Sequence, residues 1–457
     1  MPYVAAPDSN PTPDMGESAL KDKATQVVLR LQQAGFQAFW VGGCVRDFLL
    51  GREPGDFDIV TSALPDQIEK VFPRTIPVGR KFGVLIVVEG EWQFQVATFR
   101  AEAEYRDGRH PERVTFGDAR ADALRRDFTV NGLFYDPIAG ELHDWVQGEM
   151  DLRSRVIRTI GAPAERFAED HLRLLRAVRL AAQLGFEIDD STFAAVKASA
   201  GSIRTISAER IRDELLKLFQ PAHATRGLRL LSETGLLDEI LPELAATRSC
   251  EQSPDYHPEG DVFEHIALML QKLPSDADPL LAWAVLLHDI AKPVTASGDP
   301  VTGSIHFYGH ERVGAEMAEQ IMLRLRFPRK QIDEVVQVVR CHMQFKDVPA
   351  MRKSTLRRLL LRPTFPLELQ LHRLDCLGSH GHLNIYDFLV KEAVELQKVP
   401  EIIPPLLTGE DLIALGIKPG PALGQLLAQV REKQLQDELT TPTQALEWVK
   451  QQNLPRP

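Results

Sequence analysis

The stretch from residue 41 to residue 62 most constrains how this chain folds. An apolar run ends in two glycines, Gly42 and Gly43, which lead into a short segment of helical character. Two aspartates, Asp56 and Asp58, then stand directly before a β-branched run. This order of signals predicts a strand, a tight turn, a helix and a second strand in immediate succession.

The same stretch suggests a chemistry. Alternate residues of a strand point to one face, so Asp56 and Asp58 are expected to aim their carboxylates together. Mg²⁺ is usually held by one or two carboxylates together with substrate phosphates, and glycines such as Gly42 and Gly43 let the backbone approach a phosphate closely. Either feature alone is more often a structural turn. Together, with Arg46 between them, they predict a site for a metal-bound nucleoside triphosphate.

The pattern G-G-x-V-R-D-x-L-L-G followed by D-x-D resembles the head motif of class II CCA-adding enzymes and bacterial poly(A) polymerases. This resemblance implies an α+β fold, in which a nucleotidyltransferase head with a mixed β-sheet precedes helical domains. It also implies that Asp56 and Asp58 are catalytic ligands of Mg²⁺, and that Gly43 and Arg46 contact the nucleotide.

A second motif, Arg125 to Gly132, resembles the segment that recognises the ribose in the same family. The resemblance places Arg126 on the nucleotide and makes Asp127 and Asn131 hydrogen-bonding groups for the sugar or the local backbone. Taken alone, the motif is equally typical of a helix start with capping residues. The spacing of acidic and glycine residues over 144–158 resembles the hinge between head and neck.

A row of charged residues continues at helical spacing from Asp170 through Arg173 and Arg176 to Arg179. Residues three or four apart share a helix face, so these side chains are expected to project side by side, with Glu169 able to fix a guanidinium. In the family, the pair at Asp170 and Arg173 is the template that selects CTP and then ATP. The planar arginines that follow would meet the triphosphate. The alternative is a surface helix with salt bridges.

Two further features bear on this resemblance. The polar segment 99–116 resembles the family's flexible loop between strands, and its presence argues against an enzyme that adds only CC. The chain also carries Gln95 where the family commonly has an acidic residue, which leaves the third carboxylate of the head in question.

The helical part that follows contains a second group of possible metal ligands. His265, His288, Asp289 and Asp375 resemble the signature of the HD phosphohydrolase family, and His310 and His342 stand where binuclear members add ligands. Imidazole and carboxylate ligands suit a transition metal. The alternative is that this block only binds RNA.

Length and composition set the domain plan. A chain of 457 residues is too long for one core, and we expect a flexible lead-in over 1–17, a head over 18–149, a helical neck over 150–254, an HD-type domain over 255–400 and a helical tail over 401–457. The net charge of −11 argues against a surface coated for nucleic acid, but arginines and lysines gather over 152–180 and 324–362, where they can track phosphates or form solvated helix faces. No apolar run reaches the length of a membrane span, and four dispersed cysteines indicate a reduced, cytoplasmic protein.

The sequence therefore predicts a template-independent RNA nucleotidyltransferase, which adds CCA to tRNA 3′ ends from CTP and ATP by two-metal phosphoryl transfer. A poly(A) polymerase acting on another RNA 3′ end is the alternative within the family. Alternatives of other classes are an HD metal-dependent phosphohydrolase with an RNA-binding head, and an RNA-binding protein without activity. The oligomeric state stays open.

Overall fold

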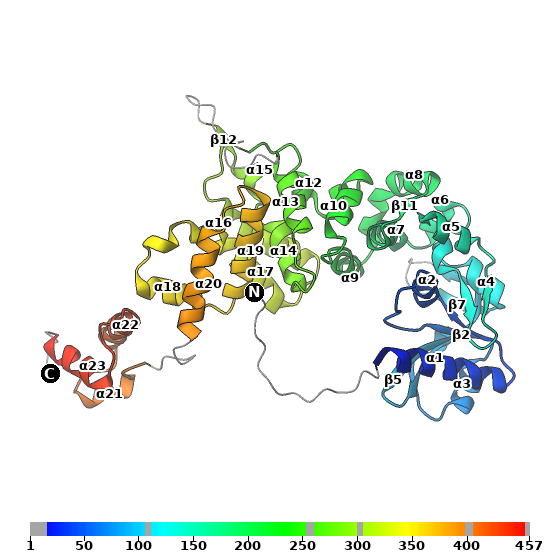
Figure 1. Ribbon diagram of the computed structural model, residues 1–457, viewed down its shortest axis with the longest axis horizontal. Coiled ribbons are helices and arrows are strands. Elements are labelled where there is room, and N and C mark those ends of the chain that lie inside the picture. The colour runs from blue at the N-terminus through cyan, green and yellow to red at the C-terminus, as the bar shows by residue number, and fades with distance from the viewer. Residues whose placement is uncertain (1–15, 106–110, 253–259, 299–304, 398–404, 453–457) are drawn as a thin grey trace. The chain divides into compact units, whose positions relative to one another are not determined.

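The computed structural model describes residues 16–105, 111–252, 260–298, 305–397 and 405–452 (Figure 1). The chain divides into two compact units: unit 1 comprises residues 1–218 and 226–240, and unit 2 comprises residues 219–225 and 241–457. Residues 1–15 of the predicted lead-in lie outside the described residues, whereas the last two belong to the first helix. No helix within these ranges is long and apolar enough to cross a membrane.

The head in unit 1 is built on a seven-stranded mixed sheet, as predicted, in the order β3-β4-β5-β2-β1-β8-β9. Neighbouring strands are antiparallel, except that β2 runs parallel to β5. The strands are β1 (Ala38–Val41), β2 (Ile59–Thr61), β3 (Thr75–Gly79), β4 (Val84–Glu89), β5 (Trp92–Thr98), β8 (Phe134–Asp136) and β9 (Glu141–His143). β4 and β5 form an antiparallel hairpin around Gly90.

Apolar residues from strands and helices form the core of the head. Phe39 and Val41 of β1 pack with Val60 of β2, Phe99 and Phe134, and all five are buried. Every residue of β1 and β2 is buried, so these two central strands are packed on both faces of the sheet, which is why the sequence shows them as continuous apolar or β-branched runs. The helices of the head are α1 (Gly16–Gln33), α2 (Gly43–Leu49), α3 (Pro65–Val71) and α4 (Ala119–Leu124).

The predicted loop over 99–116 is instead a two-stranded ribbon of β6 (Arg100–Tyr105) and β7 (Pro111–Phe116), and its residues 106–110 lie outside the described residues. The alternation of alanine and charged residues over 100–105 is a period-two pattern. The polar residues hid this pattern from a search for hydrophobic alternation, because a strand outside the main sheet has no need of a hydrophobic face. The described part of this segment is therefore stranded rather than a loop between strands.

The neck of unit 1 is helical, but it also contains a pair of two-residue strands that the all-helical prediction missed. Its elements are α5 (Gly148–Ser154), β10 (Val156–Ile157), α6 (Pro163–Glu169), α7 (Leu172–Leu184), β11 (Glu187–Ile188), α8 (Asp190–Ala198), η3 (Ala200–Thr205), α9 (Ala208–Leu218), α10 (Ala224–Glu233, whose first two residues belong to unit 2) and α11 (Leu236–Ile240). β10 and β11 are parallel. Strands this short give little periodicity from which to predict them.

The described part of unit 2 is helical apart from one short antiparallel pair, β12 (Ser297–Gly298) with β13 (Ile305–His306). Its helices are α12 (Pro242–Ala245), α13 (Val262–Gln271), α14 (Pro279–Leu287), α15 (Lys292–Thr295), α16 (His310–Arg324), α17 (Arg329–Cys341), η4 (His342–Ala350), α18 (Lys353–Leu360), α19 (Phe365–Gly378), α20 (Asn384–Gln397), α21 (Gly409–Ala414), α22 (Pro421–Leu435) and α23 (Pro442–Gln451). Helix α14 is apolar on all sides and buried from Leu280 to Leu287, which is typical of a helix at the centre of a core.

The segment predicted as a hinge joins the head to the neck through buried polar contacts. The Asp144 carboxylate accepts hydrogen bonds from the backbone N–H groups of Gly148 and Glu149, each at 3.0 Å, at the start of α5. Asp151, on the same helix, is buried and accepts a bond of 2.7 Å from the Thr129 hydroxyl. Gly148 lies so close to the head that a Cβ there would stand 2.2 Å from the Thr129 carbonyl oxygen.

We therefore predict that Gly148→Ala destabilises unit 1 by about 2–3 kcal/mol, because the added methyl must push backbone atoms apart. Urea denaturation followed by tryptophan fluorescence measures the change. Gly201→Ala is the matched control, because a Cβ at that exposed position meets nothing closer than 3.9 Å, and it should change the free energy of unfolding by less than about 0.5 kcal/mol. Equal effects of the two substitutions would contradict the prediction.

Candidate nucleotide and metal sites

The glycine turn after β1 brings two predicted nucleotide-binding residues together. Gly42 has a φ of 78°, which favours glycine. A Cβ on Gly42 would lie 3.3 Å from Nη1 of Arg126, and one on Gly43 would lie 3.6 Å from Nη2 of Arg46. The absence of side chains at the turn thus lets Arg126 and Arg46 approach the end of β1.

Arg46 itself is buried and fully engaged with protein acceptors. Its Nε and Nη2 donate to the Asp47 carboxylate at 2.9 and 2.8 Å, and its Nη1 donates to Oδ1 of Asn131 at 2.8 Å. Asn131 closes the short helical turn η2 (Thr129–Asn131). Arg46 therefore fixes α2 against η2, and its contact with a nucleotide stays a prediction.

Asp56 and Asp58 lie just before β2, which begins at Ile59 rather than at the aspartates. The Asp58 carbonyl still accepts a bond of 3.0 Å from the Val41 N–H, so Asp58 continues the pairing of β2 with β1. Burial and the negative charge of Asp56 raise the pKa of the Asp58 carboxyl, and Arg126 lowers it. The two carboxylates therefore repel each other, and a cation between them would relieve that repulsion.

The neighbouring strand supplies no third carboxylate at this place. β2 and β5 pair in parallel with Ile59 opposite Val96, and continuing this register by one residue sets Asp58 beside Gln95. Among the described residues, the groups of three or more possible metal ligands all lie in unit 2. The donor set of the head therefore fits a hard cation whose remaining oxygen ligands come from substrate phosphates.

A buried aspartate that the sequence reasoning missed holds Arg126 in place. Asp122, on α4, accepts bonds of 3.2 and 3.0 Å from Nε and Nη2 of Arg126, and it also pairs with Arg125. Burial alone would raise the pKa of Asp122, but the two arginines lower it. The spacing of four residues between Asp122 and Arg126 is the local signal that could have revealed the pair.

Asp127 links the head to the neck. Its carboxylate is buried, accepts the Phe128 N–H at 2.9 Å, and pairs with Arg176 of α7 at 2.6 Å. Burial alone would raise the pKa of Asp127, but Arg176 lowers it to about 2. Arg176 also lies 4.0 Å from Glu214 of α9, which pairs with Arg179. The row of arginines predicted to meet a triphosphate is thus engaged with buried carboxylates here.

Asp170 and Arg173, the pair predicted to read the base, each form an ion pair with another residue. Asp170 lies just before α7, accepts the Leu172 N–H at 3.0 Å and pairs with Arg210 of α9 at 2.7 Å. Arg173 pairs with Glu169, as the sequence suggested. Asp170 and Arg173 therefore each have a different partner rather than one another. Arg210 escaped prediction because it lies 40 residues further along the chain.

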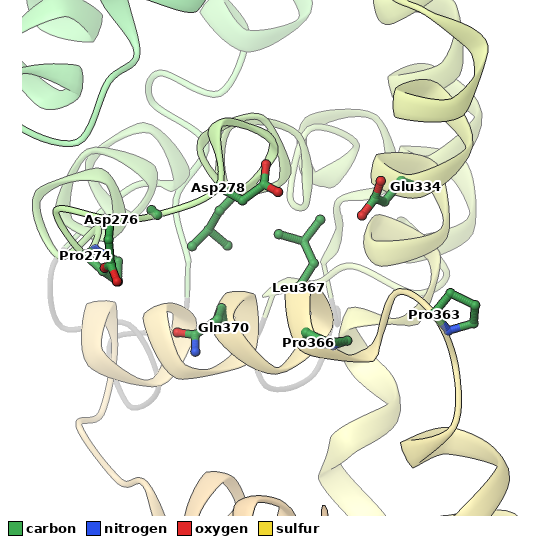
Figure 2. Close-up of a pocket in the computed structure, with 10 residues that line it drawn as sticks. Pro274, Asp276, Asp278, Glu334, Pro363, Pro366, Leu367 and Gln370 are labelled. Atoms are coloured by element: carbon green, nitrogen blue, oxygen red, sulfur yellow. The ribbon is translucent and has the colours of Figure 1, made fainter. Parts of the chain in front are cut away.

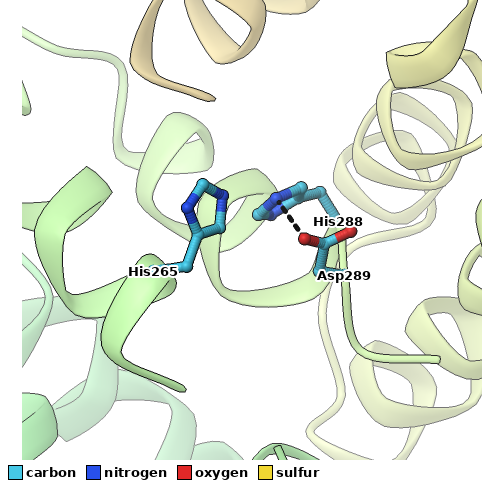
Figure 3. Close-up of side chains that lie close together, drawn as sticks. All are labelled: His265, His288 and Asp289. Carbon is cyan, nitrogen blue, oxygen red and sulfur yellow. Dashed lines mark ion pairs between the residues drawn. The ribbon is translucent and has the colours of Figure 1, made fainter. Parts of the chain in front are cut away.

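Unit 2 brings the predicted HD ligands together from four helices, and Figure 3 shows three of these residues, His265, His288 and Asp289. His265 lies on α13, His288 and Asp289 follow α14, His310 begins α16 and His342 follows α17. All five are buried, and they form two groups of three, each with ligand atoms within 4.8 Å of one another. Asp289 belongs to both groups, so its two carboxylate oxygens can serve two neighbouring metal ions.

Backbone carbonyls orient three of these imidazoles. Nδ1 of His288, His310 and His342 lies 2.9, 2.8 and 2.6 Å from the carbonyl oxygen three residues earlier. An Nδ1–H that donates to a carbonyl leaves Nε2 as the free ligand atom, as at metal sites. Burial and the neighbouring His288 lower the pKa of His342 to about 4, so this ring is a neutral ligand at neutral pH.

Two more side chains border the HD cluster. Asp375 of α19, also predicted, lies 3.1 Å from Nε2 of His265, outside the two groups of three. Lys292, which the sequence reasoning did not single out, is buried with its Nζ 2.7 Å from the Asp289 carboxylate and 2.6 Å from Oε1 of Gln252. The six predicted HD residues therefore form one continuous cluster.

A separate pocket of about 400 Å³ is formed by α14, α17 and α19 together with the segments before α14 and α19 (Figure 2). Three acidic residues, Asp276, Asp278 and Glu334, stand around apolar side chains such as Leu281 and Leu367. None of the predicted site residues lines this pocket. The negative charge of this pocket disfavours a phosphate, so the pocket is unsuited to binding a nucleotide.

Three family models match parts of the chain. Residues 38–158 match the Poly A polymerase head domain, residues 185–247 match the "Probable RNA and SrmB- binding site of polymerase A", and residues 260–377 match the HD domain. Three stretches of the chain therefore match these models, in this order along the sequence.

More particularly, the chain is similar to CCA-adding enzymes. It is 46% identical over 215 residues to that of Geobacillus sp. (strain WCH70), a match covering 47% of this chain and 53% of the relative. It is 45% identical over 205 residues to that of Staphylococcus aureus (strain bovine RF122 / ET3-1), covering 45% and 51%. The chain thus matches about half the length of these curated relatives.

Solved structures match over nearly the whole chain. The Bacillus stearothermophilus CCA-adding enzyme in complex with CTP is 28% identical, with a TM-score of 0.72 and coverage of 96% of this chain and 98% of that chain. The Thermotoga maritima CCA-adding enzyme complexed with tRNA shares the fold at 20% identity, with a TM-score of 0.56 and coverage of 96% of both chains.

The link between Asp127 and Arg176 gives a pH-dependent prediction. The pKa of Asp127 is lowered from its ordinary 3.8 to about 2 in the folded protein, so the ion pair stabilises unit 1 above pH 4 and its contribution is lost as the pH falls from 4 to 2. Asp127→Asn should therefore lower the free energy of unfolding by about 2 kcal/mol at pH 7 and by progressively less below pH 4.

Urea denaturation at a series of pH values measures this difference. Asp213→Asn is the control, because that carboxylate is 56% exposed and pairs with Arg212 at the surface. The control should shift stability by less than about 0.5 kcal/mol. A deficit of Asp127→Asn that stays constant down to pH 2.5 would rule out the ion pair as its cause.

Proposed function

We propose that this chain is a nucleotidyltransferase that adds CCA to tRNA 3′ ends from CTP and ATP, acting in the cytoplasm. The observation that carries the proposal is the repelling carboxylate pair, Asp56 and Asp58, placed beside the turn at Gly42 and under the charge of Arg126. The similarity to CCA-adding enzymes, one of them solved with CTP, supports the same reaction.

The head would act mainly by positioning the reactants. When bound by Asp56 and Asp58, Mg²⁺ supplies charge neutralisation and a two-metal clamp on the reacting oxygens. Arg126, fixed by Asp122, places a positive charge at the open turn where a triphosphate can lie against Gly42. The RNA 3′-hydroxyl then forms a bond to the α-phosphorus while pyrophosphate leaves, a reaction that depends on alignment and electrostatics.

Asp170 and Arg173 would choose the base. Cytosine and adenine both present an exocyclic amine, which donates, beside a ring nitrogen, which accepts. An aspartate acceptor next to an arginine donor complements that order. Uracil and guanine present the reverse order at the same positions. Arg210 and Glu169 hold these two side chains from the outside, so little rotamer freedom remains to be lost when a base arrives.

A poly(A) polymerase is the alternative within the family, and it would use the same catalytic residues. A labelled tRNA lacking its 3′ CCA, given CTP alone, ATP alone or both, distinguishes the two. Two added cytidines with CTP, and one further adenosine with both nucleotides, would support the proposal. A long ladder with ATP alone would establish poly(A) synthesis instead.

The same assay tests the carboxylate pair. Asp56→Asn or Asp58→Asn should reduce nucleotide addition at least about 100-fold, because metal stabilisation of the transferred phosphoryl group accounts for several kcal/mol. Asp66→Asn is the matched control, since this carboxylate of the same domain is 76% exposed on α3. Addition that survives in both site variants would overturn the assignment.

A second activity is favoured by the two ligand groups that share Asp289. We propose that the HD cluster binds divalent transition metals and hydrolyses a phosphoester, such as a 2′,3′-cyclic phosphate at an RNA end. The metals would be held by His265, His288 and Asp289 on one side and by Asp289, His310 and His342 on the other. The competing interpretation is that this domain only holds RNA.

The shared ligand makes a distinctive prediction. Asp289→Asn should weaken Mn²⁺ binding at both groups by more than about tenfold, whereas His342→Ala should weaken one and leave the other. Calorimetric titration of the metal-free full chain with Mn²⁺ measures the binding by each variant. Asp333→Asn, a change of a 56% exposed carboxylate on α17, is the control. Equal Mn²⁺ binding by Asp289→Asn and the unaltered protein would exclude this site.

A further inference from the structure

An exposed tyrosine stands beside the HD cluster without a structural reason for its exposure. Tyr308 is 77% exposed, more than any other large apolar side chain among the described residues. Its ring stacks on that of His306, with centroids 5.3 Å apart and planes at 24°. Together these rings present a flat π-surface, one face of which is open to solvent.

This surface is anchored to the metal ligands. The Phe307 carbonyl accepts from Nδ1 of His310 at 2.8 Å, and the Phe307 ring lies 5.5 Å from Nζ of Lys292, which pairs with Asp289. Gly309, with a φ of 73°, turns the chain directly into α16. Tyr308 therefore sits between two fixed neighbours, and its Cα is at most about 7 Å from that of His310.

The other end of the platform is also held. His306 belongs to β13, which pairs with β12 through Ser297, and the Ser297 hydroxyl donates to the His306 carbonyl at 3.2 Å. These contacts fix the backbone from which the His306 ring projects, so less conformational freedom is lost when the ring makes a contact. Aromatic side chains stack with any nucleobase, at about 1–3 kcal/mol per base.

We propose that Tyr308, backed by His306, is a stacking platform for the base of a terminal nucleotide whose phosphate enters the HD cluster. The inference rests on the proposed hydrolytic function and names its substrate class as a nucleotide or RNA 3′ end. In the reaction, water adds to the phosphorus of a 2′,3′-cyclic phosphate, one ring P–O bond breaks, and the proton goes to the released ribose oxygen.

The test compares two substrates on the full chain loaded with Mn²⁺: cytidine 2′,3′-cyclic phosphate and the base-free 1-O-methylribose 2,3-cyclic phosphate. Tyr308→Ala should raise KM about tenfold or more for the cytidine compound, at unchanged kcat, because one stacking contact is lost. It should leave the base-free compound unaffected. Tyr308→Phe keeps the ring and should behave like the unaltered protein.

The outcomes separate this inference from the hydrolytic proposal. Unchanged KM values for both substrates, or an equal loss with both, would overturn the platform while leaving the hydrolysis established. If the unaltered protein hydrolyses neither compound, the hydrolytic proposal fails. The platform is then judged by calorimetric binding of cytidine 2′-monophosphate, where about tenfold weaker binding only in Tyr308→Ala supports it. Equal binding by the variants, or none by the unaltered protein, overturns it.

Discussion

The buried ion pair between Asp127 and Arg176 is the constraint on which unit 1 depends. A carboxylate removed from water is stabilised only if its partner stays within hydrogen-bonding distance, and here the partner comes from a neck helix. Asp127 also lies 3.5 Å from the amide of Asn131, which in turn accepts from Arg46 beside the glycine turn. One chain of polar contacts thus runs from the end of β1 to α7, and Glu214 extends it to α9. The position of α7 against the head follows from this series of polar contacts.

The local sequence was sufficient for the elements and for residues that act at short range. Apolar and β-branched runs next to turn residues indicated the strands around the glycine turn, and the spacing of Glu169 and Arg173 revealed an ion pair that the structure contains. Partners distant in sequence were beyond such reasoning. Arg210 and Glu214 carry no local signal of their roles, because each role depends on how helices pack, whereas Lys292 stands three residues after Asp289 and could have been found from that spacing. The ribbon β6–β7 was missed for a related reason, since its polarity hides its periodicity.

The two candidate metal sites differ in preorganisation, that is, in how far the protein holds the possible ligand atoms in place. In the HD cluster, backbone carbonyls fix the imidazoles of His288, His310 and His342, so the ligand atoms already converge. In the head, two carboxylates repel each other in a partly open place. The first arrangement suits a resident transition metal with nitrogen ligands. The second suits a hard cation that arrives with its phosphates. Sequence motifs predicted the possible ligands of both sites, but only the packing of four helices shows that the HD cluster is preorganised.

The amide of Gln95 bears on how the head could hold a metal ion. In the register of β2 with β5, it stands beside Asp58, where a third carboxylate would add both a ligand and a further repulsive charge. A neutral amide there leaves two carboxylates, and burial together with the negative charge of Asp56 already raises the pKa of Asp58. Two carboxylates hold Mg²⁺ only weakly until phosphate oxygens complete an octahedral shell. On the proposed function, metal occupancy of the head would be coupled to the nucleotide, and Arg126, held by Asp122, would be the fixed positive charge that receives the triphosphate.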